Sequence, residues 1–241
     1  MLAVEGLCKR FGGFLAVNEV SFDLRAGEIL GLIGPNGSGK STTFNLIAGN
    51  LRPSAGSIRF DGREIGGLAA HAICHLGIGR TFQIPRPFRK LSLLENVTVA
   101  AYHGAGGKIS RAEAQHRAET ALEMVGLPVS SSVQTNGMGA AALKKLELAR
   151  ALATKPRLLL ADESLGGLDR EEMEHAAEVL DDIRNRLGIT IIWVEHIMGV
   201  LMRIVDRVIV LDHGEKIFEG KPAQAAVDPR VTEVYLGKAR T

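Results

Sequence analysis

The sequence predicts an α/β fold that combines a largely parallel β-sheet, a small antiparallel β-sheet and an inserted helical subdomain. Apolar strand candidates alternate with helices in the second half of the chain, which is typical of a parallel sheet covered by helices. A hairpin at residues 57–60 with an Asp61-Gly62 turn indicates the antiparallel sheet. Between these regions, two prolines, a Gly-Ala-Gly-Gly break and then helical periodicity mark the insert.

Apolar runs, caps and glycines predict the individual elements. A strand at 28–33 leads into a glycine-rich loop and a helix at 40–48. Ser110 and Glu113 fit a capping box, which opens a helix that ends near Gly126. The further strand candidates are 157–161, 189–194 and 208–211, and the helices between them begin near Asp169 and Ile197.

The predicted elements divide a single domain of 241 residues into a core and an insert. Residues 1–83 and 143–241 are expected to form the α/β core with its antiparallel β-subdomain. Residues 84–142 are expected to form the helical subdomain. Pro85 and Pro87 hold the start of this insert extended.

Composition narrows the class of protein. Hydrophobic residues make up 46% of the chain and charged residues 23%, which is typical of a folded domain. The net charge of +2 argues against a dedicated nucleic-acid partner. Two cysteines are too few for a disulfide framework and suggest a reducing compartment. The first residues lack the pattern of a signal peptide, and no run of about 18 apolar residues occurs. We therefore expect a cytosolic domain.

The loop after the first core strand fits the phosphate-binding pattern G-x-x-x-x-G-K-[ST]. Its glycines let backbone N–H groups turn around an anion, and the following helix adds the positive end of its dipole. Lys40 would contact the β- and γ-phosphates of ATP, and the Ser41 hydroxyl would ligate Mg²⁺. The nucleotide-binding candidates of this loop are Gly34, Pro35, Asn36, Gly37, Ser38, Gly39, Lys40, Ser41 and Thr42.

Two later strands end in residues suited to the same chemistry. Asp162 would bind Mg²⁺, and Glu163 would polarise an attacking water as general base. The alternative is an ordinary strand end with solvated acids. His196 lies two residues beyond an apolar strand, where a γ-phosphate contact competes with a structural role. The sequence HAICH at 71–75 is interpreted as a helix surface, because no second pair of metal ligands accompanies it.

The ordered set formed by the phosphate loop, Gln83, LELARAL, LLLADES, GGLD and VEH resembles the ATP-binding subunit of ABC transporters, over essentially the whole chain. This resemblance implies a RecA-like core, a β-subdomain and a helical subdomain. It also implies that two subunits sandwich two ATP molecules and drive a membrane permease. By matching position, Phe11 would stack on adenine, and Gln83 would contact Mg²⁺ and sense the permease. Glu163 corresponds to the catalytic glutamate, His196 to the switch histidine, and 166–169 to the D-loop.

Narrower features resemble one branch of this family, the branched-chain (hydrophobic) amino-acid importers. They are FGGFLAV, GIGRTFQ followed by LSLLENVTVA, and DPRVTEVYLG. RTFQ and the longer helical insert are similar to the first of that system's two different ATPase subunits. Importers of urea, amides or small organic acids share these features, so the substrate stays open. The resemblance implies a peripheral subunit on the cytoplasmic face of the inner or plasma membrane.

The segment Met138-Gly-Ala-Ala-Ala142 departs from the family, which carries a motif like L-S-G-G-Q at this place. That motif faces the partner's ATP, and here Gly139 offers no hydroxyl while Ala141 replaces a glycine. In a heterodimer this chain's own ATP could still be hydrolysed, whereas both sites would be weakened in a homodimer, so a heterodimer is favoured. The alternative interpretation is that the segment is a tolerated variant. The alternatives to a transport ATPase are a low-turnover regulatory ABC module and a non-transport ABC ATPase.

Overall fold

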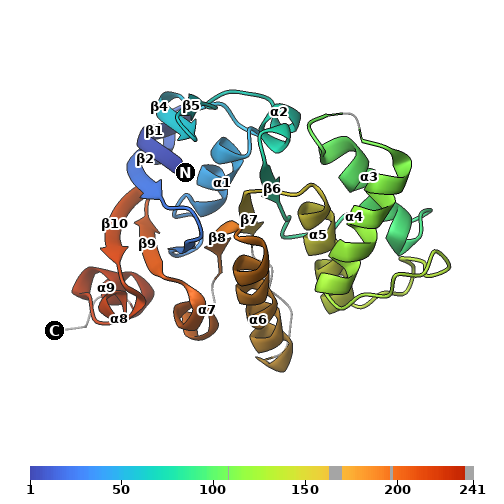
Figure 1. Cartoon of the computed structure of the whole chain (residues 1–241). Helices are drawn as coiled ribbons and strands as arrows, with labels where there is room; N and C mark the ends of the chain where they lie inside the picture. The colour runs from blue at the N-terminus through green and yellow to red at the C-terminus, as the bar shows by residue number, and fades with distance from the viewer. Residues whose placement is uncertain (108, 163–169, 196–197, 237–241) are drawn as a thin grey trace. The chain divides into compact units, whose positions relative to one another are not determined.

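The computed structural model describes residues 1–107, 109–162, 170–195 and 198–236. Its chain forms two compact units, one made of residues 1–70 and 190–241 and the other of residues 71–189. Figure 1 labels the helices and strands of both units. No helix in the described ranges combines the length and apolar character that a membrane crossing needs.

The first unit contains a four-stranded antiparallel sheet in the order β2-β1-β4-β5. Alternate side chains of β1 and β2 are buried, among them Leu2, Val4 and Val20, so this sheet has one face toward a core. The predicted Asp61-Gly62 turn joins β4 to β5, with φ angles of 48° and 77°. The strands are β1 (Leu2–Phe11), β2 (Phe14–Leu24), β4 (Ala55–Phe60) and β5 (Arg63–Glu64).

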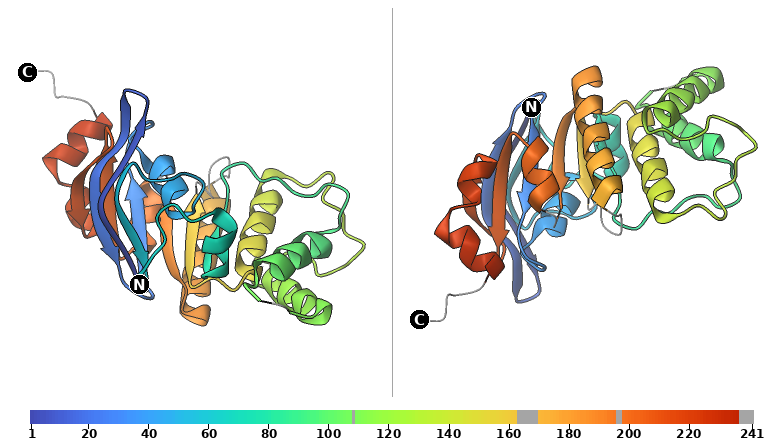
Figure 2. Two further views of the ribbon diagram at one scale, coloured as in Figure 1. Left: turned by 90° about the horizontal axis from the view of Figure 1, so that it is seen from above. Right: turned by 90° about the horizontal axis from the view of Figure 1, so that it is seen from below.

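The same unit holds the strand run β10-β9-β3-β8. Strand β3 lies parallel to both β8 and β9, whereas β10 is antiparallel to β9. All five residues of β3 are buried, as expected for a central parallel strand. Helices α8 and α9 lie beside β10 (Figure 2). The bounds are β3 (Ile29–Ile33), α1 (Lys40–Ile47), β8 (Thr190–Val194), α7 (Met198–Ile204), β9 (Arg207–Asp212), β10 (Glu215–Gly220), α8 (Pro222–Ala225) and α9 (Pro229–Leu236).

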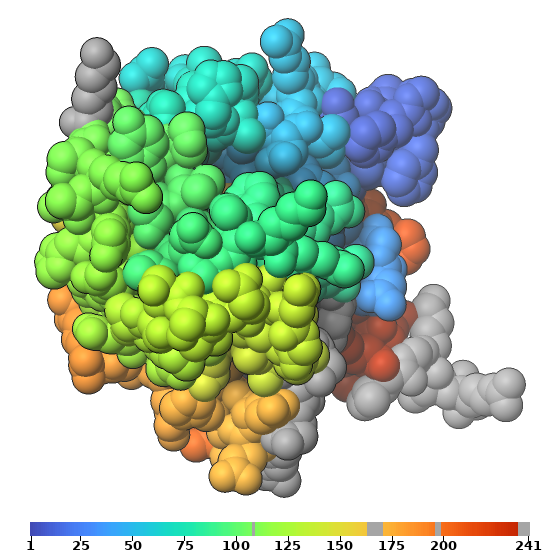
Figure 3. All heavy atoms as spheres, turned by 90° about the vertical axis from the view of Figure 1, so that its right-hand side faces the viewer, coloured from blue at the N-terminus to red at the C-terminus, as the bar shows by residue number. Residues whose placement is uncertain are grey.

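The second unit combines two parallel strands with helices. Strand β6 pairs with β7, and Arg80 lies opposite Leu160 in this register. Helices α3, α4 and α5 pack on one another, and Figure 3 looks onto the face of this unit that α3, α4 and their flanking segments form. The bounds are α2 (Ala70–His75), β6 (Ile78–Arg80), α3 (Leu93–Gly104), α4 (Arg111–Met124), α5 (Ala140–Ala153), β7 (Leu158–Asp162) and α6 (Arg170–Leu187).

These elements confirm the predicted α/β fold class with its antiparallel sheet, parallel strands and helical segment. HAICH lies on α2, as expected. The helices predicted to begin near Asp169 and Ile197 are present as α6 and α7, although residues 163–169 and 196–197 lie outside the described residues. The division at residues 84 and 142 stays a prediction.

One predicted cap forms only in part. The Ser110 hydroxyl accepts the Glu113 N–H at 3.0 Å and caps α4. The Glu113 carboxylate, however, binds Arg117 at 2.7 Å and Lys155 at 3.5 Å, so the reciprocal half of the box is absent. A complete capping box stands instead at the start of α3, where Ser92 and Glu95 exchange bonds of 3.2 and 2.8 Å.

Candidate functional site

The phosphate loop connects buried β3 to α1, and its shape requires glycine at two positions. Gly34 and Gly39 have φ angles of 148° and 104°. A Cβ at Gly34 would lie 2.1 Å from the Leu211 carbonyl oxygen, and one at Gly39 would lie 2.7 Å from that of Ala16. Neither position has room for a side chain, so the backbone alone forms this wall of the loop.

The polar groups of this loop suit a triphosphate. Lys40 is 5% exposed, and its ammonium donates to the carbonyl oxygens of Gly34 at 2.8 Å and Pro35 at 2.9 Å. Among the described residues, the Ser38 hydroxyl is buried and has no hydrogen-bond partner. Helix α1 begins without a side-chain cap, so its first N–H groups are available to an anion. Ser41 is exposed and Thr42 half-buried in the first turn.

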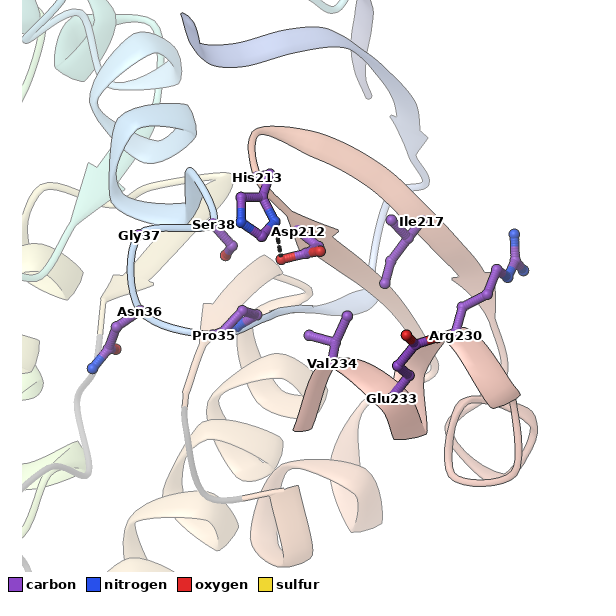
Figure 4. A pocket seen from close by; sticks show the side chains of 10 residues that line it. All are labelled: Pro35, Asn36, Gly37, Ser38, Asp212, His213, Ile217, Arg230, Glu233 and Val234. Carbon is purple, nitrogen blue, oxygen red and sulfur yellow. Dashed lines mark ion pairs between the residues drawn. The ribbon is translucent and has the colours of Figure 1, made fainter. Parts of the chain in front are cut away.

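The turn between β9 and β10 supports the loop from one side. The Gly214 N–H donates to the Ser38 carbonyl at 3.0 Å, and the Asn18 N–H donates to the Gly214 carbonyl at 2.8 Å. A pocket of about 590 Å³ lies beside the loop, with the Asp212–His213 pair at 2.8 Å on one wall and α9 on another (Figure 4). Its lining consists of Pro35, Asn36, Gly37, Ser38, Asp212, His213, Ile217, Arg230, Glu233 and Val234.

Helix α9 reaches the first glycine of the phosphate loop. Loss of water around the Tyr235 hydroxyl raises its pKa, and a hydrogen bond with the Gly34 backbone opposes that rise. Neither Tyr235 nor the α9 residues of the pocket were singled out from the sequence as site residues. The sequence offers no local signal for this contact, because about 200 residues separate its two partners.

Phe11 ends β1 in the same unit as the phosphate loop. Its side chain is 46% exposed, so an aromatic face is accessible there. The Lys9 ammonium lies 5.0 Å from the ring centroid, within the range of a cation–π contact. Phe14, which pairs with Phe11 across the hairpin, is 65% exposed. Stacking of Phe11 on adenine stays a prediction.

In the second unit, Asp162 ends β7 and is 5% exposed. Its Oδ2 accepts a hydrogen bond from Arg80 Nη2 at 2.7 Å. Its backbone N–H donates to the Thr81 hydroxyl at 3.1 Å. Arg80 at the end of β6 thus holds the carboxylate of Asp162, and Thr81, the next residue, holds its backbone. Arg80 was not singled out from the sequence.

The remaining predicted residues are distributed as follows. Gln83 follows this segment at the surface of the second unit. Glu163, His196 and the predicted D-loop, residues 166–169, lie outside the described residues. The structure therefore brings the phosphate-loop residues together in the first unit. In the second unit it brings Asp162 together with Arg80 and Thr81, which precede Gln83 in the chain.

Gly139 is the N-cap of α5. Its φ and ψ angles are −69° and 168°, and no side chain caps the helix start. Its carbonyl oxygen accepts the Leu143 N–H at 3.1 Å. A Cβ built at this position would meet nothing within 4 Å. The backbone at Gly139 would therefore accept a serine, and the structure gives no steric reason for the missing hydroxyl in Met138-Gly-Ala-Ala-Ala142.

Comparison with known protein families agrees with the resemblance described above. The ABC transporter family matches residues 17–166. A second family, branched-chain amino acid ATP-binding cassette transporter, matches residues 215–241. The matched ranges include the phosphate loop, Asp162 and the C-terminal segment with α9.

Curated relatives align over nearly the full chain. The high-affinity branched-chain amino acid transport ATP-binding protein LivG of Salmonella typhimurium (strain LT2) is 38% identical, covering 99% of this chain and 98% of LivG. LivG of Escherichia coli (strain K12) is 36% identical with the same coverage. BraF of Pseudomonas aeruginosa, described in the same words as LivG, is 35% identical, again over 99% and 98%.

Solved structures share the architecture. The ADP conformation of MJ1267, an ATP-binding cassette of an ABC transporter, superposes with a TM-score of 0.89 at 28% identity, covering 99% of both chains. A dimeric post-hydrolysis state of the cassette MJ0796, bound to ADP and Pi, superposes with a TM-score of 0.82 at 28% identity, covering 92% of this chain and 99% of MJ0796. The chain therefore belongs to the ATP-binding cassettes of ABC transporters, with their RecA-like P-loop core.

Proposed function

We propose that this chain is the ATP-binding and ATP-hydrolysing subunit of an ABC importer for branched-chain or other hydrophobic amino acids. The observation that carries the proposal is the phosphate loop, where the Lys40 ammonium, the Ser38 hydroxyl and an uncapped helix start converge on one backbone cradle. The full-length similarity to LivG and BraF supports the substrate class. The subunit acts at the cytoplasmic face of the membrane, bound to a separate permease.

The residues divide into binding and catalytic roles. Lys40 and the loop backbone hold the β- and γ-phosphates, and Phe11 stacks on the base. Ser41, Gln83 and Asp162 would hold Mg²⁺, which would neutralise charge on the transferred phosphoryl group. Glu163 is the general base for the attacking water, and His196 contacts the γ-phosphate. Gly139 and its helix start face the ATP of a second ATPase subunit, and a different partner chain is favoured over a second copy.

An exposed apolar segment supports docking to the permease. The docking loop, residues 82–91, has three apolar side chains with 48%, 69% and 47% of their surface exposed, namely Phe82, Ile84 and Phe88. Singly exposed apolar residues are ordinary, but three within seven positions form a patch suited to a protein partner. Its cationic neighbours are Arg86, Arg89 and Lys90.

Side-chain contacts hold the docking loop at Phe88, as a pre-formed binding surface would require. The Asn96 side chain is fully buried, accepts the Phe88 N–H at 2.8 Å and donates to the Ser92 carbonyl at 2.9 Å. Arg150 of α5 lies 5.3 Å from the Phe88 ring centroid and binds Glu147 at 2.9 Å. Burial raises the pKa of the Glu147 carboxyl, and the charge of Arg150 opposes that rise.

The test of the proposed function is the substitution Lys40→Ala. Because Lys40 is the lysine of the phosphate loop, ATP affinity is expected to fall by at least about 100-fold, which corresponds to about 2.7 kcal/mol. Isothermal titration of the purified chain with Mg-ATP measures this change. Lys155→Ala, which removes a lysine side chain that is 63% exposed, is the matched control and should bind as the original chain does. Equal ATP affinity in the two variants, with both shown to be folded by thermal melting, would contradict the nucleotide assignment.

A further inference from the structure

A residue with no assigned role forms a buried ion pair with the candidate magnesium carboxylate. Arg80 Nη2 lies 2.7 Å from Asp162 Oδ2, and the two side chains are only 10% and 7% exposed. Both residues belong to the second unit and end neighbouring parallel strands, β6 and β7. Parallel pairing places the ends of these strands side by side, which explains how residues separated by 82 positions form this contact.

The neighbouring residues make this ion pair a fixed arrangement. The Thr81 hydroxyl accepts the Asp162 N–H at 3.1 Å, and the Thr81 N–H donates to the Leu160 carbonyl at 3.0 Å. The Phe82 ring centroid lies 5.0 Å from the guanidinium carbon of Arg80. Arg80 and Thr81 thus hold the carboxylate and the backbone of Asp162, and Phe82 contacts Arg80.

The chemistry of arginine suits such a positioning role. Its guanidinium is planar and permanently charged, so it fixes the direction of a hydrogen bond that a flexible ammonium would leave variable. A buried carboxylate that loses its charged partner is strongly disfavoured, so the pair constrains Asp162 whenever the segment is folded. With Oδ2 held by Arg80, Oδ1 is the oxygen that the described residues leave for a cation.

We propose that Arg80 is a positioning residue for the nucleotide site, which orients the Asp162 carboxylate so that Oδ1 is available to the magnesium ion of Mg-ATP. The inference rests on the proposed function. Arg80 acts through Asp162 and does not itself touch the nucleotide. Because Gln83 follows three positions later, the same short segment also joins this carboxylate to the docking loop.

The experiment compares ATP affinity in Mg²⁺ with ATP affinity in EDTA, by isothermal titration of the purified chain. Their ratio, the magnesium gain, isolates the metal contribution from phosphate binding. Arg80→Met is expected to lower the magnesium gain by about tenfold, as for the loss of other residues that orient a metal ligand. ATP affinity in EDTA should stay within about twofold of the original, since the phosphate loop is untouched.

Arg150→Met is the matched control. Arg150 also pairs with a buried carboxylate, Glu147, at 2.9 Å and also contacts a phenylalanine ring. Its partner is Glu147 and not Asp162, so its magnesium gain should equal that of the original chain. Arg80→Lys keeps the charge, so its magnesium gain should lie between those of Arg80→Met and the original chain. If Arg80→Met does not fold, the magnesium gain of Arg80→Lys tests the proposal in its place.

Three outcomes separate the possibilities. If the magnesium gain is undiminished in Arg80→Met, the pair merely stabilises the fold and the proposal is overturned. The same holds for an undiminished magnesium gain in Arg80→Lys, where only that variant folds. A larger gain would show that the guanidinium competes with the metal, and would overturn it as well. If the original chain binds no ATP under either condition, the proposed function fails and the inference fails with it.

Discussion

Glycine is the N-cap residue of both α1 and α5, but the fold requires glycine at only one of these two positions. Gly39 precedes α1 and Gly139 precedes α5, and neither helix has a side-chain cap. Gly39 has a left-handed φ of 104°, and a Cβ there would lie 2.7 Å from the Ala16 carbonyl oxygen. Gly139 has an extended backbone and open space around it.

This difference shows which glycine the fold requires. At α1 the backbone must approach closely, so only glycine fits and the anion site consists of N–H groups and Lys40. At α5 the backbone conformation is the one that serine N-caps adopt, so the fold accepts a hydroxyl that the sequence does not supply. The geometry of the phosphate loop therefore excludes a side chain at Gly39, whereas the start of α5 accepts one at Gly139.

The largest expected effect comes from Gly39→Ala. The added methyl group would strike the Ala16 carbonyl and occupy a left-handed backbone region, so the loop must shift. ATP affinity is expected to fall by about 100-fold or more, about 2.7 kcal/mol, in isothermal titration. Gly139→Ala is the matched substitution and should leave ATP affinity of the isolated chain unchanged. Similar losses in both variants would contradict the distinction between the two helix starts.

A smaller effect is expected when Gly139→Ser and Ala141→Gly are combined. The serine returns a hydroxyl donor at the start of α5, and in the proposed dimer the glycine would remove a methyl group that faces the partner's γ-phosphate. Turnover at saturating Mg-ATP should rise by about 10- to 100-fold, which corresponds to about 1.4–2.8 kcal/mol of transition-state stabilisation.

The rates of the original and restored chains are to be compared with and without the second ATPase subunit. Monomer affinity for ATP should not change, because the phosphate loop is unaltered. If all four rates agree within about twofold, the backbone of α5 suffices and Met138-Gly-Ala-Ala-Ala142 is no defect.

The smallest expected effect is on stability. Gly139→Ser alone adds an N-cap side chain to a backbone already in the required conformation, which stabilises the fold by a few tenths of a kcal/mol. In a chain of this length the melting temperature should rise by about 1 °C. Thermal melting followed by circular dichroism measures the change, with Gly139→Ala as the variant that gains no hydroxyl. A lower melting temperature in the serine variant would mean that the helix start differs from the one described.

Local sequence patterns predicted the central elements within one or two residues. The strand expected at 28–33 is β3, Ile29–Ile33, and the helix expected at 40–48 is α1, Lys40–Ile47. The glycines of the phosphate loop could be recognised because the motif is contiguous and each glycine has a local conformational reason. The roles of Glu163 and His196 stay predictions.

Long-range contacts were beyond the reach of local patterns. Strand β6 has three residues, too few to show a period, so its pairing with β7 and the Arg80–Asp162 ion pair could not be foreseen. The two sequences that fit a capping box are equally good locally. The Glu113 carboxylate binds Arg117 one helical turn later at 2.7 Å and the distant Lys155 at 3.5 Å, in place of the helix start, and the second contact depends on the tertiary structure.

The hydrogen bonds of the Asn96 side chain have a consequence for the kinetics of assembly. Asn96 Nδ2 donates to the carbonyl oxygens of Phe88 at 3.1 Å, Leu91 at 3.1 Å and Ser92 at 2.9 Å, so the second half of the docking loop has its conformation without a partner. A pre-ordered surface binds by rigid docking, without a slow folding step. Its association rate constant would therefore lie in the usual range of about 10⁵–10⁷ M⁻¹s⁻¹, and substitutions in the loop would alter mainly the residence time of the complex.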